Sequence, residues 1–217
     1  MDDDPWRMFL VVRRGAFDEL SVGGALAGAA AVACLRAFAD DAVHGAAIAA
    51  WRERPGKVTL RARGGQWPEL LASEPHAIAG DPDGASVVAL PPRRRSERSE
   101  LLRRLQAMSS ELEPAPEVED PEPDRERMTY LLNPRLSMSS GKTLAQVAHA
   151  ATMAAATGRV EGWVAAGCPG RVLVPSPAAF DALCGTGVLA AEVVDAGLTE
   201  VPPGTVTALA LAPDGQG

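Results

Sequence analysis

MSSGKTLAQVAHAA, at residues 138–151, is the stretch from which the fold of this chain can be worked out. The serines at its start are residues that cap the first amides of a helix. Lys142, Gln146 and His149 are spaced at i, i+4 and i+7, so on a helix they lie along one stripe among Ala, Leu and Val. The stretch therefore predicts an apolar helix with one polar stripe that faces a polar group.

A second stretch of this kind lies earlier in the chain, where residues 20–33 read LSVGGALAGAAAVA, at an offset of 118. Each stretch follows a short apolar run (MFLVV, MTYLL) and precedes a Gly-led β run (GKVTLRAR, GRVLVPSP), a short helix (QWPELLAS, AAFDALCG) and two apolar runs. The shared order β-α-β-α-β-β predicts an internal repeat, with chance similarity of two Ala-rich helices as the alternative. Only the first copy is expected to continue into a last helix, RRRSERSELLRRLQAM.

The segment between the two copies, residues 109–127, has four prolines, eight carboxylates and no apolar periodicity. Such a segment is expected to be an extended, mobile linker. We therefore expect a degenerate domain at 1–108, an acidic Pro-rich linker at 109–127, and a domain with the motif residues at 128–217. The predicted fold class is α/β, with two tandem α/β/α units, each a four-stranded mixed sheet covered by helices.

Composition indicates a soluble globular protein, since 47% of the residues are hydrophobic and 23% are charged. The N-terminal MDDDPWR lacks the basic and apolar regions of a secretory signal, which predicts a cytoplasmic protein. The longest apolar run, residues 22–35, is shorter than the roughly 20 residues that a bilayer requires, so no membrane partner is expected. The three cysteines lack metal-ligand spacing, and neither a metal nor another cofactor is predicted.

The net charge of −7 would argue against a nucleic-acid partner if it were spread over the chain. Residues 109–127 alone carry −6, whereas residues 1–108 carry +1 and residues 128–217 carry −2. Because the acidity is concentrated between the predicted domains, a nucleic-acid partner is not excluded.

Two residues of the second half are candidates for chemistry. Lys142 falls in the first turn of its helix, where a cation is unfavourable unless an anion binds beside the free amides of residues 140–142. A solvated surface lysine is the alternative. In VVDAGLTEVPPGTVTAL, Asp195 ends an apolar run, where partial desolvation suits a carboxylate to act on water; a turn-forming Asp is the alternative.

Taken together, the two segments resemble the archaeal and eukaryotic-type peptidyl-tRNA hydrolases. This family has a loop ending in Gly-Lys, a helix reading AAQxAHA, and a late DAGRT-type loop that closes in PGT before the final strand. The resemblance covers about 86 residues. The matching residues are Gly141, Lys142, Ala145, Gln146, Ala148, His149, Ala150, Asp195, Ala196, Gly197, Thr199, Pro203, Gly204 and Thr205.

The resemblance implies hydrolysis of the ester that joins a peptide to the 3′ ribose of tRNA. It implies three catalytic residues: Lys142 stabilises negative charge, Asp195 orients or deprotonates water, and Thr199 hydrogen-bonds the water or the aspartate. Gln146 and His149 would position the ribose-ester end. The substrate-binding residues implied by the resemblance are Gly141, Gln146, His149 and Thr205.

The sequence departs from the family pattern at three positions, each with a loss of positive charge or polarity. Ser140 replaces a second lysine, Leu198 replaces an arginine, and Glu200 replaces a glutamine. These changes weaken attraction to RNA phosphates, so the alternative function is a weakly active or inactive binding or regulatory protein on the same scaffold.

The first half lacks the residues expected to catalyse. At the offset of 118, Lys142, Gln146 and His149 are replaced by Gly24, Gly28 and Ala31, respectively. Its arginines, among them the triplet at 93–95, either bind RNA or form a solvated face. Family members are commonly homodimers, and we expect the two halves to pack as an intramolecular pseudo-dimer in a monomeric protein.

Overall fold

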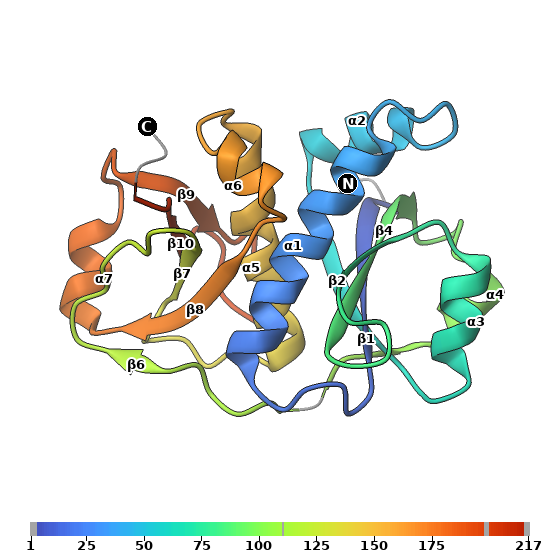
Figure 1. Cartoon of the computed structure of the whole chain (residues 1–217), viewed down its shortest axis with the longest axis horizontal. Helices are drawn as coiled ribbons and strands as arrows, with labels where there is room; N and C mark the ends of the chain where they lie inside the picture. Colours follow the sequence, from blue (N-terminus) through green and yellow to red (C-terminus); the bar gives the residue numbers. More distant parts are fainter. Residues whose placement is uncertain (1–3, 110, 198–199, 215–217) are drawn as a thin grey trace.

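The computed structural model describes residues 4–109, 111–197 and 200–214, and it has two mixed β-sheets with helices between and around them (Figure 1). The strand orders are β3-β4-β1-β2-β5 and β6-β8-β7-β10-β9. The predicted fold class, two α/β units with mixed sheets, is confirmed. Each sheet has five strands instead of four, because a two-residue strand extends its edge.

The first sheet is built around β1. Its strands are β1 (Trp6–Arg13), β2 (Lys57–Ala62), β3 (Ala77–Gly80), β4 (Ser86–Arg94) and β5 (Gln106–Ala107), and its helices are α1 (Leu20–Phe38), α2 (Gly45–Glu53), α3 (Gln66–Ser73) and α4 (Glu100–Arg104). β1 pairs with β2 in parallel and with β4 antiparallel. The parallel pair is joined by a crossover through α1 and α2, as parallel strands require.

The second sheet is built around β7 in the same way. Its strands are β6 (Glu117–Val118), β7 (Met128–Leu132), β8 (Gly170–Pro175), β9 (Leu189–Val194) and β10 (Val206–Leu211), and its helices are α5 (Ser140–Ala156), α6 (Glu161–Ala165) and α7 (Pro177–Leu183). β7 pairs with β8 in parallel and with β10 antiparallel. The four longer strands of each sheet therefore have the same order and relative directions. In the first sheet this order is β3-β4-β1-β2, and in the second it is β9-β10-β7-β8.

The prediction of a last helix in the first half, over residues 93–108, is wrong for most of that stretch. β4 continues through Pro91 and Pro92 to Arg94, since two successive prolines favour extended backbone. The helix that follows spans only Glu100–Arg104, and the Ser99 hydroxyl caps it by accepting from the Leu102 amide at 3.2 Å.

α1 and α5 lie side by side between the two sheets (Figure 1) and pack through small residues. A Cβ on Gly24 would lie 2.8 Å from Val172 Cγ2, and one on Gly28 would lie 3.1 Å from both Ala151 Cβ and the Tyr130 hydroxyl. The absence of side chains at these two glycines therefore lets α1 approach the second unit closely.

The apolar cores of the two units are continuous across this contact. Leu144 and Ala148 of α5 pack in one cluster with Ala27 and Ala31 of α1. α1 is longer than the apolar run at 22–35 and, by length and composition, could cross a membrane. In this fold it is an internal helix, packed between two sheets.

The acidic segment between the units is extended, and its backbone is hydrogen-bonded to both of them. The Glu113 amide donates to the Asp18 carbonyl at 2.7 Å, and the Val174 amide donates to the Pro116 carbonyl at 2.9 Å. The Leu112 amide donates to the Ser140 hydroxyl at 2.9 Å. The segment thus follows the surfaces of both units and provides strand β6.

The close contact of the two helices predicts a stability effect at Gly28. Gly28→Leu is expected to lower the free energy of unfolding by about 1 to 3 kcal/mol, because the side chain meets Ala151 and Tyr130 in a packed interface. Gly64→Leu is the control, since a Cβ there meets nothing within 4 Å. Urea unfolding of both variants checks this, and equal stabilities would contradict the packing role.

Candidate active site

Local sequence fixes the start of α5 and so the position of Lys142. The Ser139 hydroxyl accepts a hydrogen bond from the Lys142 amide at 3.3 Å and thereby caps the helix. Small and apolar residues follow, and most of α5 is buried. The polar side chains of its stripe are therefore surrounded by protein. The prediction of a helix with a polar stripe is confirmed.

Asp195 follows the last residue of β9 and lies where the chain turns towards β10. Its amide donates to the Thr205 carbonyl at 2.8 Å, and the Gly204 amide donates to its carbonyl at 2.9 Å. Gly197, at φ +73°, donates its amide to Asp195 Oδ1 at 2.8 Å. The two ends of the loop are therefore tied together, and the carboxylate is held in one orientation.

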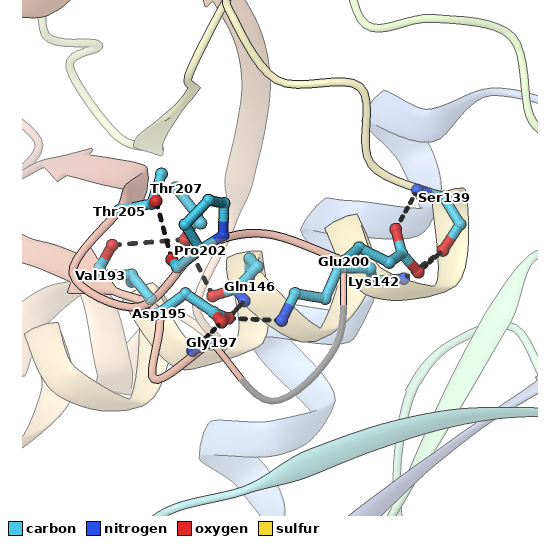
Figure 2. Close-up of polar contacts among 10 residues, drawn as sticks. All are labelled: Ser139, Lys142, Gln146, Val193, Asp195, Gly197, Glu200, Pro202, Thr205 and Thr207. Atoms are coloured by element: carbon cyan, nitrogen blue, oxygen red, sulfur yellow. Dashed lines mark hydrogen bonds and ion pairs between the residues drawn. The ribbon is translucent and has the colours of Figure 1, made fainter.

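Lys142 and Asp195, 53 positions apart in the chain, form an ion pair between Lys142 Nζ and Asp195 Oδ2 (Figure 2). The same oxygen accepts from Gln146 Nε2 at 2.7 Å. Gln146 is held in turn, because its Oε1 accepts from the Thr207 hydroxyl at 3.0 Å. The structure thus brings the predicted lysine, glutamine and aspartate into one polar cluster.

Both charges of this pair are largely enclosed: the side chains of Lys142 and Asp195 are 13% and 8% exposed, respectively. Burial raises the pKa of Asp195, but the hydrogen bonds from Lys142, the Gly197 amide and Gln146 outweigh it, and the net pKa is below the usual 3.8. The carboxylate is therefore ionised at neutral pH. The cluster offers a fixed cation beside an anionic hydrogen-bond acceptor.

The other predicted site residues lie in different surroundings. His149 contacts the first unit, where its Nδ1 lies 3.1 Å from Lys57 Nζ. The Thr205 hydroxyl donates to the Pro202 carbonyl at 2.8 Å within its own loop. Thr199 lies outside the residues that the structure describes.

Gly141 is a packing position in this structure. A Cβ there would lie 2.5 Å from the Met108 carbonyl oxygen, and its own carbonyl accepts from the Thr59 hydroxyl at 2.8 Å. Both partners belong to the first half of the chain. The glycine therefore lets that half approach the start of α5.

Two further residues take part in these contacts: Thr207, which was not found from the sequence, and Glu200, which the sequence marked only as a departure from the family pattern. Thr207, a fully buried residue in β10, donates to Gln146 and so supports it. The alternating pattern VTALAL predicts a strand but only weakly indicates a polar contact of its threonine. Glu200 accepts from the Ser139 amide at 2.7 Å and from its hydroxyl at 2.6 Å (Figure 2). A carboxylate from the chain itself thus lies at the start of α5, next to Lys142.

Neither Lys142 nor Asp195 lines either of the two hollows described along this part of the chain. One of these lies along residues 118–125 beside Arg171, and the other lies beside the start of α5. Among the described residues, no group of three His, Cys, Asp or Glu side chains is placed to hold a metal ion.

Comparison with known proteins connects this geometry with one family. The family model described as "Peptidyl-tRNA hydrolase PTH2" matches residues 127–216. A peptidyl-tRNA hydrolase of Pyrobaculum aerophilum is 36% identical over 100 residues, which cover 40% of this chain and 83% of that protein. A search of solved structures gave no significant match.

The matched region contains β7, α5 and the Asp195 loop, so the family's motifs and the polar cluster coincide. The chain belongs to the PTH2 family of peptidyl-tRNA hydrolases, through its second half. The predicted family is confirmed.

The Lys142 contact predicts a change in the pKa of Asp195. In Lys142→Met the pKa should rise, because burial persists while a hydrogen bond and a positive charge are lost. In the wild type, the lowered pKa stabilises the fold above the unfolded value of about 3.9, and this is lost as pH falls through the folded pKa. A carboxyl ¹³C NMR titration measures both; an unchanged pKa would contradict the ion pair.

Proposed function

We propose that this chain hydrolyses the ester between a peptide and the 3′ ribose of tRNA, at the Lys142–Asp195 pair. The observation that supports the proposal best is the meeting of these two side chains, from separate family motifs, in one polar cluster. The name of the Pyrobaculum relative states the same activity for that protein.

The hydrogen bonds of Asp195 suggest how water is held. Oδ2 accepts from Lys142 and Gln146, and Oδ1 accepts from the Gly197 amide, which leaves acceptor capacity on Oδ1 for a water. Because the lowered pKa makes this carboxylate a weak base, Asp195 first orients the water and accepts its proton only as the water oxygen bonds to carbon and becomes acidic.

The reaction then proceeds by ordinary ester hydrolysis. The water oxygen bonds to the ester carbonyl carbon, and negative charge develops on the carbonyl oxygen. The Lys142 ammonium stabilises this charge, as a preorganised cation in an enclosed site does. Collapse breaks the bond to the ribose oxygen, which takes the proton held by Asp195, and the peptide acid loses its remaining proton to solvent. The products are a peptide carboxylate and a free 3′-hydroxyl.

The remaining site residues have supporting roles in this proposal. Gln146 holds the Asp195 carboxylate, and Thr207 holds Gln146. Thr199 would hydrogen-bond the water or the aspartate. Thr205 closes the catalytic loop, while Gly141 places the start of α5 where its amides and Lys142 can meet the substrate's ribose-phosphate end.

We also propose that the two halves arose by tandem duplication, with domains at 1–108 and 128–217 joined by the segment 109–127. The support is the shared element order and the equivalent order of the four longer strands in each sheet. The pairing of α1 with α5 between the sheets suggests a pseudo-dimer within one monomeric chain. A cytoplasmic location fits a tRNA substrate.

A second candidate function is binding or regulation without efficient hydrolysis. It is favoured by Glu200, which holds a negative charge at the start of α5, and by Ser140, which replaces a lysine of the family. Both changes weaken the attraction of this surface for tRNA phosphates. Hydrolysis by the purified wild type separates the two candidates.

Substitution of the pair tests the catalytic roles. Lys142→Met and Asp195→Asn should each lower the turnover of peptidyl-tRNA by about a hundredfold to a thousandfold, since each removes a charge that acts in the transition state. Arg159→Met, at an exposed position in the same half, should leave turnover unchanged. Single-turnover hydrolysis measures this, and wild-type rates in either pair variant would exclude the assignment.

Removal of the Glu200 charge is expected to improve substrate binding, in contrast to the losses expected at the ion pair. Glu200→Gln should lower the KM for peptidyl-tRNA by roughly two- to fivefold, the range expected for one exposed charge, because repulsion of the substrate is relieved. Glu161→Gln removes an equal charge at an exposed position of α6 and serves as the control. A KM that is unchanged or higher in Glu200→Gln alone would contradict this role.

A further inference from the structure

Lys57, the first residue of β2, extends from the first unit to the helix that carries the polar stripe. Its Nζ lies 3.1 Å from His149 Nδ1 and 2.9 Å from the Thr152 hydroxyl, both on α5. The same ammonium group lies over the Trp51 ring, 4.6 Å from the ring centroid. The half without the catalytic motifs thus contacts the polar stripe of the other half's active-site helix through Lys57.

The polar stripe of α5 therefore has partners in both units. Lys142 and Gln146 contact Asp195 of the second unit, and His149, the next residue of the stripe, contacts Lys57 of the first. His149 is half-buried, and no described residue hydrogen-bonds its Nε2. This nitrogen is the part of the ring that remains available to a substrate.

The surroundings of Lys57 show which group is the donor in its hydrogen bonds with His149 and Thr152. The Thr152 hydroxyl lies 3.0 Å from both the Ala148 and His149 carbonyls, so its proton goes to a carbonyl and its oxygen accepts from Lys57. The face of Trp51 favours the ammonium form. An ammonium group has no lone pair, so Nδ1 of His149 must accept from it, and the ring proton is on Nε2.

The charges around the imidazole act in the same direction. Burial, followed by the charges of Lys57, Lys142 and Arg7, holds the pKa of His149 well below its usual 6.5. Burial also lowers the pKa of Lys57. The Trp51 ring and the Thr152 oxygen beside Lys57 both favour its ammonium form, whereas the positive charges around His149 favour the neutral imidazole.

We propose that Lys57 is a positioning residue for the second unit's active site, and that it holds His149 as the neutral tautomer with hydrogen on Nε2. The Nε2–H group then donates to an oxygen of the ribose-phosphate end of the tRNA substrate. The second statement rests on the proposed function, whereas the tautomer of His149 does not. The first unit is thereby a functional part of the site, although it lacks the catalytic motifs.

The tautomer can be measured without any substrate. The chain has three histidines, and ¹⁵N NMR of the full-length protein, with His149→Gln for assignment, identifies the ring nitrogens of His149. In the wild type we expect an unprotonated Nδ1 and a protonated Nε2. In Lys57→Met we expect a mixture of tautomers. A wild-type Nδ1–H tautomer would overturn the proposal, even if Lys57→Met failed to fold.

Hydrolysis of peptidyl-tRNA gives an independent readout. Lys57→Met should reduce kcat/KM about tenfold, close to the cost of one hydrogen bond to substrate, and His149→Gln should reduce it by a similar factor. The double variant should be no slower than either single variant, because both changes act on the same hydrogen bond. Arg52→Met, which removes an exposed charge from α2, is the control.

Additive losses in the double variant would overturn the coupling of Lys57 to His149. If the wild type does not hydrolyse peptidyl-tRNA at all, the proposed function fails, while the ¹⁵N tautomer still decides whether Lys57 controls His149. The two failures are therefore distinguishable.

Discussion

The close packing of α1 against α5 is the constraint on which the rest of the structure depends. Helices pack this closely only where small side chains face each other, and Gly24, Gly28 and Ala151 satisfy that requirement. The contact unites the apolar cores of the two sheets and fixes one face of α5 against the first unit. In this packing the polar stripe has partners in both units, since Lys142 contacts Asp195 and His149 contacts Lys57.

The geometry of the Lys142–Asp195 cluster is determined by backbone and side-chain contacts acting together. The hydrogen bonds between Asp195 and residues 204–205 close the loop, so the carboxylate position follows from the pairing of β9 with β10. Gln146 connects this loop to α5 and, through Thr207, to the sheet. The cluster is thus preorganised, which is what charge stabilisation in a transition state requires.

Much of this arrangement was predictable from the sequence. The repeated order of apolar runs and helices predicted both units, and the resemblance to the peptidyl-tRNA hydrolases implied that Lys142, Gln146 and Asp195 share a site. The contact of His149 with Lys57 was not predictable, because it depends on how two units pack. Short-range patterns also failed at the expected last helix, where Pro91 and Pro92 prolong a strand. The hydrogen bonds of residues 112–116 to both units could not be found from a proline-rich, acidic composition.

Covalent connection through the segment at 109–127 changes the thermodynamics of the contact between the halves. In two separate subunits, association depends on protein concentration and carries a cost in translational and rotational entropy. The connecting segment replaces this with an intramolecular contact, whose effective concentration does not depend on the amount of protein. The two surfaces also need not be identical, as they must be in a twofold homodimer. Each half could therefore diverge independently at the interface, and dilution would not separate Lys57 from His149.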